Sequence, residues 1–482
     1  MTNNNTIIVW LRQDLRLADN PALFEACKTD SNIIPLYILD DENAAEWKQG
    51  GAARVWLHHA LESLNKDLDG KLHIAKGKAD KVIPELIKQS GAQAIYWNRC
   101  YEPWRIKRDK NIKAALKERN IDVQTFNGSL LWEPWTVLKD DGTPYRVFSP
   151  FYRKGCLKNG EAPRAPLSKP PSIDTQTIDG SLNVNDLNLL PTRPWGEEIT
   201  EGWDISEQGA LNRLDDFLDD GLNDYKDGRN LPAGNNVSRL SPYLKLGLIS
   251  PNTAWYKAEE RGTAEDWERD RDHFLSELGW REFSYSLLYH FPELPWDNLN
   301  QKFNAFPWSD KDSEDLKAWQ RGQTGYPIVD AAMRELYQTG YMHNRTRMIV
   351  GSFLVKNLLI HWHKGEEWFW DCLFDADLAS NSASWQWIAG CGADAAPYFR
   401  IFNPVLQSEK FDKQGEYIKK YVPELKNLDA KYLHAPWDAP PLILQEAGIT
   451  LGKEYPHPIV DHSKARDRAL EAFQSTKQEN AA

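Results

Sequence analysis

The chain has 482 residues, of which 41% are hydrophobic and 27% are charged, and its formal net charge is −12. This length exceeds what one ordinary core organises, so two or more domains are expected. The composition is that of a soluble globular protein. The acidic balance argues against a general nucleic-acid binder, although a local cluster of Arg and Lys on one face would still bind phosphate.

The five cysteines are scattered, odd in number and without metal-ligand spacing. They indicate a reducing cytoplasm, no structural disulfides and no metal site. No apolar run reaches transmembrane length, and the stretch 7–11 is too short for a signal peptide, so a cytoplasmic monomer without membrane contact is expected. The 21 tryptophans are unusual; most should fill the core, and a minority could stack on a cofactor or a base.

Short apolar runs alternate with amphipathic stretches in the first 130 residues. The runs predicted as strands are Ile7–Leu11, Ile33–Leu39, Leu72–Ala75, Ala94–Trp97 and Val123–Phe126. The stretches predicted as helices are Pro21–Cys27, Ala52–Leu68, Ala79–Gln89 and Trp104–Arg119. This alternation predicts an α/β domain, residues 1–130, with a doubly wound parallel sheet. No Gly-x-Gly-x-x-Gly follows the first strand, so the usual dinucleotide fingerprint is absent.

The periodic pattern is lost between residues 131 and 205, which are predicted to be a long interdomain linker. Prolines and small polar residues break helices there; the prolines are Pro163, Pro166, Pro170, Pro171, Pro191 and Pro194. Residues 206–482 are predicted to form an all-α domain. One helix should begin at Pro327 and end before Gly340, and another should cover most of Lys464–Ala482.

The stretch Tyr341–Asp412 is the most informative part of the helical half. It contains Tyr-Met-His-Asn-Arg-Thr-Arg-Met from Tyr341, Asp-Ala-Asp-Leu-Ala-Ser-Asn from Asp375, and Trp-Gln-Trp from Trp385. Charged groups within otherwise apolar helices need partners, because an unpaired buried charge costs several kcal/mol. The pattern therefore predicts a polar cofactor held inside a helical bundle.

These motifs resemble the FAD-binding domain of the DNA photolyase/cryptochrome family. The likeness extends from Val9–Arg16 to Asn403-Pro404 and Glu409–Asp412, and it looks most like the class I cyclobutane pyrimidine dimer (CPD) photolyases. The resemblance implies an α/β antenna-type domain and a helical catalytic domain that binds FAD and DNA. It also implies light-dependent splitting of dimers in single- or double-stranded UV-damaged DNA, by electron transfer from photoexcited reduced FAD.

The resemblance assigns a first set of residues to FAD. They are Tyr225, Val237, Ser238, Arg239, Leu240, Ser241, Arg281, Arg347, Asp375, Asp377 and Asn381. The 238–241 turn would bind the pyrophosphate, although Ser238 alone would be an ordinary helix N-cap. Family members often have Thr where this chain has Val237. Arg347 and Asp375 would form an ion pair beside the flavin ring, and Asn381 would face flavin N5, where an amide favours a photolyase over a cryptochrome.

Two further sets carry electrons and the substrate. The electron chain implied by the resemblance is Trp385, Trp362 and Trp308, and the segment after Trp308 is one residue longer than in the family. The lesion-binding set is Glu277, Trp280, Asn344, Met348 and Trp387. Glu277, Trp280 and Arg281 are spaced to share one helix face. Candidates for DNA phosphate contacts are Arg345, Arg400 and Lys410, for which solvated surface charge is the ordinary alternative.

Three alternatives stay open at this level: a cryptochrome-type photoreceptor, a (6-4) photolyase and a flavoprotein with another electron-transfer role. His343 fits a (6-4) enzyme, but Met348 stands where that subfamily has its second histidine. The antenna chromophore (deazaflavin, folate or flavin) is also undecided. Trp104 and Arg105 replace the Asn-Glu pair of folate-type members, whereas Glu102-Pro103 and Ala53–Val55 look more like deazaflavin-type members.

Overall fold

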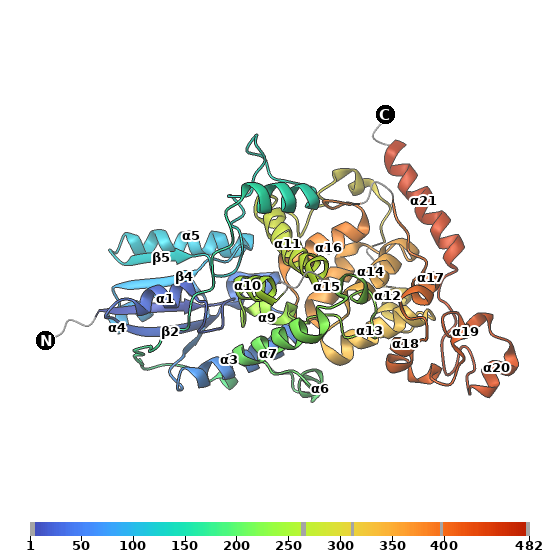
Figure 1. The fold of residues 1–482 in the computed structure, drawn as a ribbon, viewed down its shortest axis with the longest axis horizontal. Coiled ribbons are helices and arrows are strands. Elements are labelled where there is room, and N and C mark those ends of the chain that lie inside the picture. The colour runs from blue at the N-terminus through green and yellow to red at the C-terminus, as the bar shows by residue number, and fades with distance from the viewer. Residues whose placement is uncertain (1–4, 262–266, 310–312, 396–398, 479–482) are drawn as a thin grey trace. The chain divides into compact units, whose positions relative to one another are not determined.

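The computed structural model describes residues 5–261, 267–309, 313–395 and 399–478. The chain divides into two compact units, each described by itself (Figure 1). The first unit comprises Met1–Asn223, Ser238–Pro292 and Phe374–Ala379. The second unit comprises Asp224–Val237, Glu293–Leu373 and Ser380–Ala482. The units do not follow chain order. The segments Ser238–Pro292 and Phe374–Ala379, which carry the 238–241 turn and the two aspartates Asp375 and Asp377, belong to the first unit. The boundaries near residues 130 and 205 stay a prediction.

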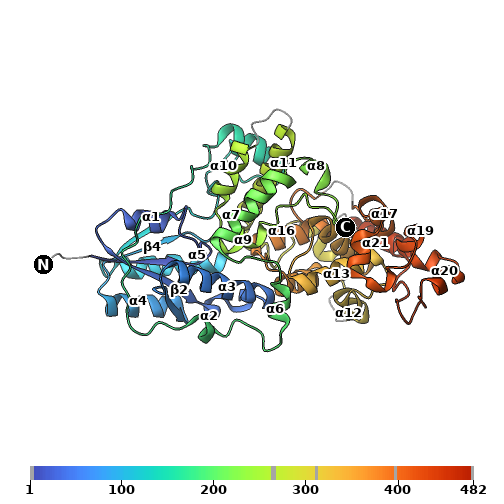
Figure 2. The ribbon, with the colours of Figure 1, turned by 60° about the horizontal axis from the view of Figure 1, so that its bottom comes forward.

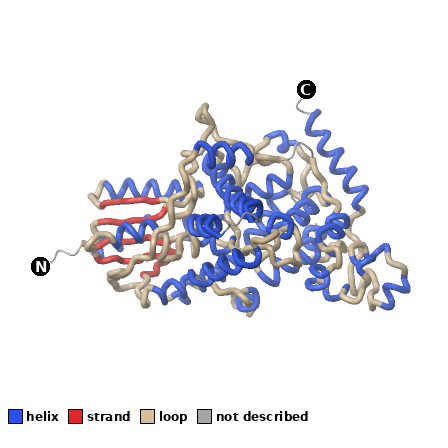
Figure 3. The backbone as a smooth tube through the Cα atoms, viewed as in Figure 1, coloured by secondary structure: helices blue, strands red, loops and turns tan. Residues whose placement is uncertain are grey.

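The first unit is built around a parallel sheet with the strand order β3-β2-β1-β4-β5. The strands are β1 (Thr6–Leu11), β2 (Asn32–Leu39), β3 (His73–Lys76), β4 (Ala94–Asn98) and β5 (Asp122–Phe126). Figure 3 shows them gathered in one place, with helices and loops elsewhere. In register, Val9 of β1 lies between Pro35 of β2 and Tyr96 of β4. Chain order changes direction at β1, and open α/β sheets bind ligands at the carboxyl ends of such strands.

Helices cover both faces of this sheet, as predicted for a doubly wound fold. The covering helices are α1 (Pro21–Cys27), α3 (Gly51–Asp67), α4 (Ala79–Ser90) and α5 (Pro103–Lys117). Figure 2 shows α1 on one side of the strands and α4 on the other. On the α4 side, Ile8 and Trp10 of β1 pack with Ile83 of α4 and Ile112 of α5. These side chains alternate along β1 because successive residues of a strand face opposite sides.

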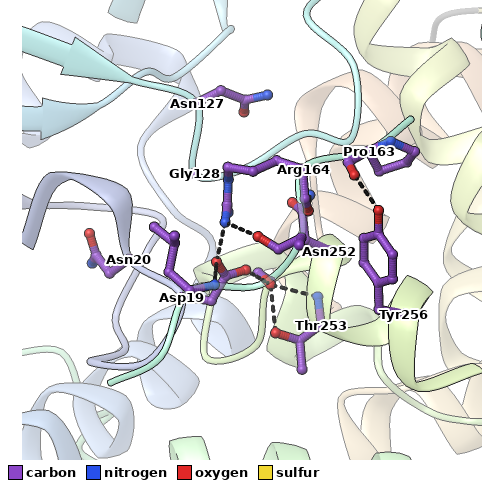
Figure 4. A network of polar contacts seen from close by, with 12 residues as sticks. Asp19, Asn20, Asn127, Gly128, Pro163, Arg164, Asn252, Thr253 and Tyr256 are labelled. Carbon is purple, nitrogen blue, oxygen red and sulfur yellow. Dashed lines mark hydrogen bonds and ion pairs between the residues drawn. The ribbon is translucent and has the colours of Figure 1, made fainter. Parts of the chain in front are cut away.

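The stretch after β5 has little regular structure and is held by polar contacts within the first unit. Its helices are η2 (Pro150–Asn159, of π type), η3 (Val184–Leu187) and α6 (Trp195–Ile199). Arg164 forms an ion pair with buried Asp19 at 2.6 Å, as Figure 4 shows. Asn252 donates to the Arg164 carbonyl at 2.6 Å, and Tyr256 donates to the Pro163 carbonyl at 2.5 Å. The predicted linker is therefore held within the first unit by contacts at Pro163 and Arg164. It also contains a ten-residue helix that the sequence pattern did not indicate.

The remaining chain is helical, as predicted from Glu207 onward. In the first unit the helices are α7 (Glu207–Asp216), η4 (Phe217–Gly221), α9 (Ser241–Leu246), α10 (Pro251–Arg261) and α11 (Glu268–His290), with α2 (Asp41–Ala44) and η1 (Ala45–Trp47) before α3. Those of the second unit up to α16 are α8 (Tyr225–Gly228), η6 (Gln301–Ala305), α12 (Glu314–Arg321), α13 (Pro327–Thr339), α14 (Asn344–Ser352), η7 (Phe353–Asn357) and α15 (Trp362–Cys372). Those from α16 onward are α16 (Leu378–Ala389, which begins in the first unit), α17 (Pro404–Phe411), α18 (Glu416–Tyr421), η8 (Pro423–Leu425), α19 (Ala430–Leu433), η9 (Pro436–Asp438), α20 (Pro441–Glu446) and α21 (His462–Gln478).

The limits of α13 are those that the sequence predicts. Pro327 occupies its first turn, and Gly340 ends it in the left-handed conformation at φ 63°. Glycine adopts that conformation without steric penalty, so it is the usual residue just past a helix end. The predicted C-terminal helix is also present, and it begins two residues earlier than expected; residues 479–482 lie outside the described part. In the described part of the chain, no helix combines the length and apolarity needed to span a bilayer.

Candidate functional site

The 238–241 turn of the first unit leads directly into α9. Arg239 adopts a left-handed backbone at φ 52°, and α9 begins at Ser241 without a side-chain cap hydrogen bond. Ser238 accepts only a long hydrogen bond, 3.4 Å, from the Leu240 N–H, so it is not the N-cap of this helix. The exposed Ser241 hydroxyl donates to Asp375 at 2.5 Å. The turn thus combines a hydroxyl, a guanidinium and uncapped amides, which are the groups that bind a diphosphate.

Asp377 lies in a buried cluster in the same unit. Its carboxylate accepts a short hydrogen bond from the Tyr285 hydroxyl. The Arg281 guanidinium lies 4.8 Å from the Tyr285 ring and donates to Glu282 at 3.0 Å. Burial acts to lower the pKa of Arg281, but the charges of Tyr285, Glu282 and Asp377 outweigh it and raise the pKa. Arg281 is therefore a half-buried cation beside one of the predicted cofactor carboxylates.

Lys245 is a functional candidate that the sequence analysis missed. It is buried on α9, one turn after Ser241, and its Nζ lies 3.4 Å from Gln49 Oε1. Burial lowers the pKa of Lys245 to about 8, while the charges of Asp377 and Glu102 counteract this effect. The only available signal was a lysine between two leucines in an otherwise apolar helix, which is also common on protein surfaces.

Two predicted cofactor residues of the second unit, Arg347 and Tyr225, are placed by local contacts. Arg347 Nε donates to the Met342 carbonyl at 2.8 Å, and its guanidinium lies 5.6 Å from the Tyr341 ring. Tyr225 is buried at the start of α8, with the Arg229 guanidinium 5.4 Å from its ring. Val237, half-buried, offers no hydroxyl, as the sequence already showed.

Asn381 is buried near the start of α16, where its amide is oriented by α15. Its Nδ2 donates to the Glu366 carbonyl at 3.1 Å, so Oδ1 is the atom that can accept from a ligand. The Glu366 carboxyl accepts from the Ser382 hydroxyl at 2.5 Å. Burial raises the pKa of Glu366 to about 8, although the Ser382 hydrogen bond opposes the shift. Glu366 was not predicted, because a lone Glu in an amphipathic helix carries no signal.

The proximal tryptophan of the predicted electron chain is fixed by a glycine. Trp385 is 3% exposed and packs edge-on against Phe369 with ring centroids 5.0 Å apart. A Cβ on Gly365 of α15 would lie 2.1 Å from its indole, so only glycine leaves room for the ring. Trp362 begins the same helix, less than one turn before Gly365. Both tryptophans of this pair are therefore placed by the first turn of α15, one as a member of the helix and the other packed against it.

The other two members of the chain meet at a histidine. Trp362 is fully buried, and its indole N–H donates to Asn298 at 2.9 Å. The His361 ring stacks on Trp362 with centroids 5.5 Å apart, and it meets the Trp308 ring edge-on at 5.7 Å. Trp308 is half-buried. The structure thus places an imidazole in contact with both indoles, which the sequence did not indicate.

The predicted lesion-binding residues of the first unit lie on α11. Glu277 and Trp280 are both half-buried, one turn apart, and Glu277 lies 3.9 Å from His273 on the preceding turn. The Trp280 indole stacks on Phe148 of the proline-rich segment, with centroids 3.8 Å apart and an interplanar angle of 11°. Arg281 follows on the same face, as the spacing predicted.

The lesion-binding residues of the second unit lie on α14 and α16. Asn344 is exposed at the first position of α14, and half-buried Met348 follows one turn later. The Met348 sulfur lies 3.7 Å from a terminal nitrogen of Arg345. Half-buried Trp387 donates its indole N–H to the Asp394 carbonyl at 3.1 Å. Asn344 and Met348 therefore project from one helix face, as their spacing predicted.

Two of the three predicted phosphate contacts gather at one aromatic ring. The Arg345 guanidinium lies 4.3 Å from the Phe411 ring, and the Lys410 ammonium lies 5.0 Å from it. Burial lowers the pKa of Arg345, and the charge of Arg229 lowers it further. Arg229 is thus a neighbouring cation that the sequence analysis missed, because it is far from Arg345 in the chain. Arg400 is exposed.

The carboxyl edge of the sheet carries a second polar cluster in the first unit. The Arg105 guanidinium lies 4.5 Å from the Trp104 ring and 3.2 Å from the Glu102 carboxylate, which also accepts from Gln13 at 2.7 Å. Glu102 Oε2 and Arg12 Nε are buried without a hydrogen-bond partner among the described residues. Such unsatisfied buried groups indicate a site for a polar ligand.

Comparison with known proteins identifies the family of this chain. Residues 274–475 match the family model described as the FAD binding domain of DNA photolyase, and residues 7–171 match the DNA photolyase model. A deoxyribodipyrimidine photo-lyase of Agrobacterium fabrum is 48% identical over 98% of each chain. Cryptochrome-2 of Arabidopsis thaliana is 36% identical over 99% of this chain and 80% of its own. A solved bacterial class III photolyase from Agrobacterium tumefaciens superposes with a TM-score of 0.94 at 46% identity, covering 99% of both chains.

The chain therefore belongs to the DNA photolyase/cryptochrome family, and it carries that family's FAD-binding domain. The predicted fold class, an α/β sheet domain and a helical FAD-binding domain, is confirmed. The predicted class I subfamily is not confirmed, since the solved structure of 46% identity is a class III photolyase.

Proposed function

We propose that the chain is a photolyase that splits CPDs in UV-damaged DNA under blue or near-UV light. The observation that carries this proposal is the composition of one face of α11. Glu277 and Trp280, assigned to the lesion, precede Arg281, whose charge is coupled to Asp377 and Tyr285. One rigid helix therefore links the lesion-binding groups to the cofactor-binding groups. The 48% identity to a curated deoxyribodipyrimidine photo-lyase supports the same conclusion.

The residues present fit FAD. The Ser238–Ser241 turn and the uncapped start of α9 in the first unit suit its diphosphate, and half-buried Arg347 of the second unit supplies a cation. The oriented Asn381 amide presents an oxygen that accepts from an N–H. Bound FAD, fully reduced and excited by light, supplies the electron that opens the cyclobutane ring and recovers it afterwards. The test is direct: purified protein should release one FAD per chain on denaturation, and a protein that cannot be loaded with FAD would contradict the proposal.

The chain's own residues bind, orient and dehydrate the lesion. The Glu277 carboxyl hydrogen-bonds the imide edge of the dimer, and Asn344 adds a polar contact. Trp280, Trp387 and Met348 supply apolar walls. A dimer that stacks and pairs poorly costs less to flip out of the duplex than an intact base, so part of the selectivity arises before contact with the pocket.

The same residues favour a CPD over a (6-4) lesion. Repair of a (6-4) lesion needs a proton transfer, which histidine provides and the Met348 thioether does not. His343 is 2% exposed, and its Nδ1 accepts from the Arg345 N–H at 3.1 Å as the N-cap of α14. Its cap role gives His343 a structural reason to be present. We therefore assign the CPD as the substrate.

Reducing electrons reach the site through Trp385, Trp362 and Trp308. Trp385 is buried against Gly365 of α15, and Trp362 lies less than one turn before Gly365 on that helix. Half-buried Trp308 offers the route to solvent, and His361 contacts the indoles of Trp308 and Trp362. The chain supplies electrons from solvent to the cofactor, whereas repair itself returns its electron and consumes none.

An antenna chromophore occupies the carboxyl edge of the sheet in this proposal. The unsatisfied buried groups of Arg12 and Glu102 support a polar ligand there. Trp104 and Arg105 contact each other at 4.5 Å and stand where the folate contacts would be. The usual folate contacts are therefore absent, and a deazaflavin or a flavin fits better.

The deciding experiment is repair of oligonucleotides that carry one defined lesion. Under blue light the reduced protein should repair a CPD in single- and double-stranded DNA, should leave a (6-4) lesion intact, and should do nothing in the dark. Glu277→Ala should lower CPD repair while FAD stays bound. A cryptochrome, the alternative favoured by the 36% identity to Cryptochrome-2, would repair neither lesion. The class I subfamily, a cytoplasmic location and a monomeric state stay predictions.

A further inference from the structure

An aromatic stack connects the proline-rich segment with the lesion-binding face of α11. Phe148 lies against Trp280 with ring centroids 3.8 Å apart and planes 11° apart, and Tyr152 continues the stack at 5.5 Å and 9°. Phe283 makes edge-type contacts with both Phe148 and Trp280, with ring centroids 6.0 Å and 5.9 Å apart. All four residues belong to the first unit. The Trp280 indole is thus covered on one face by Phe148, and Phe283 flanks it at a steep angle.

The glycine that precedes Trp280 makes this arrangement possible. A Cβ on Gly279 would lie 2.5 Å from the Tyr152 ring, so any larger residue would push η2 away from α11. Glycine weakens a helix interior, and its presence in the middle of α11 has a packing reason. Tyr152 is buried, and Phe148 is 8% exposed. The stack is therefore a built feature of the fold and not an accidental surface contact.

We propose that Phe148 is a positioning residue for lesion recognition: it holds the Trp280 indole in one plane so that the opposite face meets the flipped dimer. The inference rests on the proposed function, which assigns Trp280 to the lesion. A half-buried indole covered on one face and touched at its edge has few rotamers left. Trp280 is therefore oriented before DNA binds, and such preorganisation increases affinity without adding a contact to the ligand.

The predicted effect is confined to damaged DNA. Loss of one stacked aromatic partner corresponds to an affinity that is lower by about 3- to 10-fold. Binding of undamaged DNA depends on phosphate contacts, and the candidates for these are Arg345 and Lys410 on other helices. Phe148→Leu should therefore raise the Kd for a duplex with one CPD by about 3- to 10-fold and leave the Kd for the undamaged duplex unchanged.

The experiment measures dark binding of both duplexes to FAD-loaded protein. Phe148→Tyr, which keeps the ring, should restore CPD binding, and Phe148→Met provides a second ring-deleting variant should Phe148→Leu fold poorly. The matched control is Phe151→Leu, because Phe151 is buried in η2, three residues after Phe148, and contacts Tyr145 and Phe283. The control should destabilise the fold without changing the preference for CPD.

Three results would overturn the inference. Unchanged CPD binding by both ring-deleting variants would show that Trp280 needs no support. An equal loss in Phe151→Leu, or a loss that Phe148→Tyr does not restore, would show a general packing effect. If the wild-type protein binds the two duplexes equally, the proposed function itself fails. The wild-type protein alone gives that outcome. A failure of the proposed function is therefore distinguished from a failure of the role proposed for Phe148.

Discussion

Two helical glycines beside Trp385 offer a matched test of how tightly the proximal tryptophan is held. Gly365 of α15 and Gly351 of α14 both face this indole within the second unit. A Cβ at Gly365 would lie 2.1 Å from the ring, whereas a Cβ at Gly351 would lie 3.6 Å from it and 3.4 Å from Ile388. The same substitution, glycine to alanine, is therefore an overpacking change at one site and an ordinary contact at the other.

The magnitudes follow from these distances. In Gly365→Ala the indole must retreat by about 1.3 Å to reach van der Waals contact, and overpacking of this kind costs about 1–3 kcal/mol. Alanine recovers about 0.5–1 kcal/mol of helix propensity, so the net loss lies between about 0 and 2.5 kcal/mol. Gly351→Ala gains the propensity term without the clash. It should increase the free energy of unfolding by about 0.5–1 kcal/mol.

Urea denaturation of both variants measures these differences, and photoreduction of the bound flavin measures the consequence for electron transfer. Gly365→Ala should slow photoreduction because the ring of Trp385 moves, while Gly351→Ala should leave the rate unchanged. A Gly365→Ala protein as stable as the Gly351→Ala protein would refute the close approach of Trp385 to α15.

Three further predictions concern the electron chain, the buried acid and the antenna. Trp385→Phe should slow photoreduction, and CPD repair by chemically reduced enzyme should persist; transient absorption with an unchanged photoreduction rate would reject Trp385 as the proximal donor. The pKa of Glu366, raised from 4.5 to about 8, means that the folded state holds its proton more tightly than the unfolded state. The contribution of this proton to the free energy of unfolding is therefore fully present below pH 4.5. It is lost as the pH rises toward 8, at roughly 1.4 kcal/mol per pH unit at most. Glu366→Gln should remove this part of the pH dependence of urea denaturation, and an unaltered profile would place the titration elsewhere. For the antenna, reconstitution with methenyltetrahydrofolate should give no tight complex because Trp104 and Arg105 occupy the usual contacts, whereas efficient energy transfer from bound folate would contradict the assignment.

Local pattern alone predicted the strands of the first unit and the four main helices that connect them. All five strands and the four helices between them lie within one or two residues of their predicted limits. The reason is that period and end signals are local: Pro21 after the Asn20 cap begins α1, and Pro327 and Gly340 delimit α13. The helix Pro150–Asn159 was missed because its π-type turn does not follow the periodicity of an α-helix.

The sequence also predicted the motif-bearing residues, because the resemblance assigns them by order and spacing. It could not predict the partners that hold them. Asp377 meets Tyr285 across 92 positions of the chain, and Phe148 meets Trp280 across more than a hundred. Neither pairing has a period or a spacing that marks it. Such contacts depend on how helices and loops pack, and packing is decided by the shape of the whole core.

The sequence by itself thus determined the layered sheet, the helix limits and the residue types of the candidate site. Only the tertiary structure decided which charges are buried together and which rings are stacked. Lys245 shows the difference: its sequence context is ordinary, but burial lowers its pKa to about 8 against the opposing charges of Asp377 and Glu102. Burial and electrostatic coupling act through space between segments distant in the chain, so no local pattern encodes them.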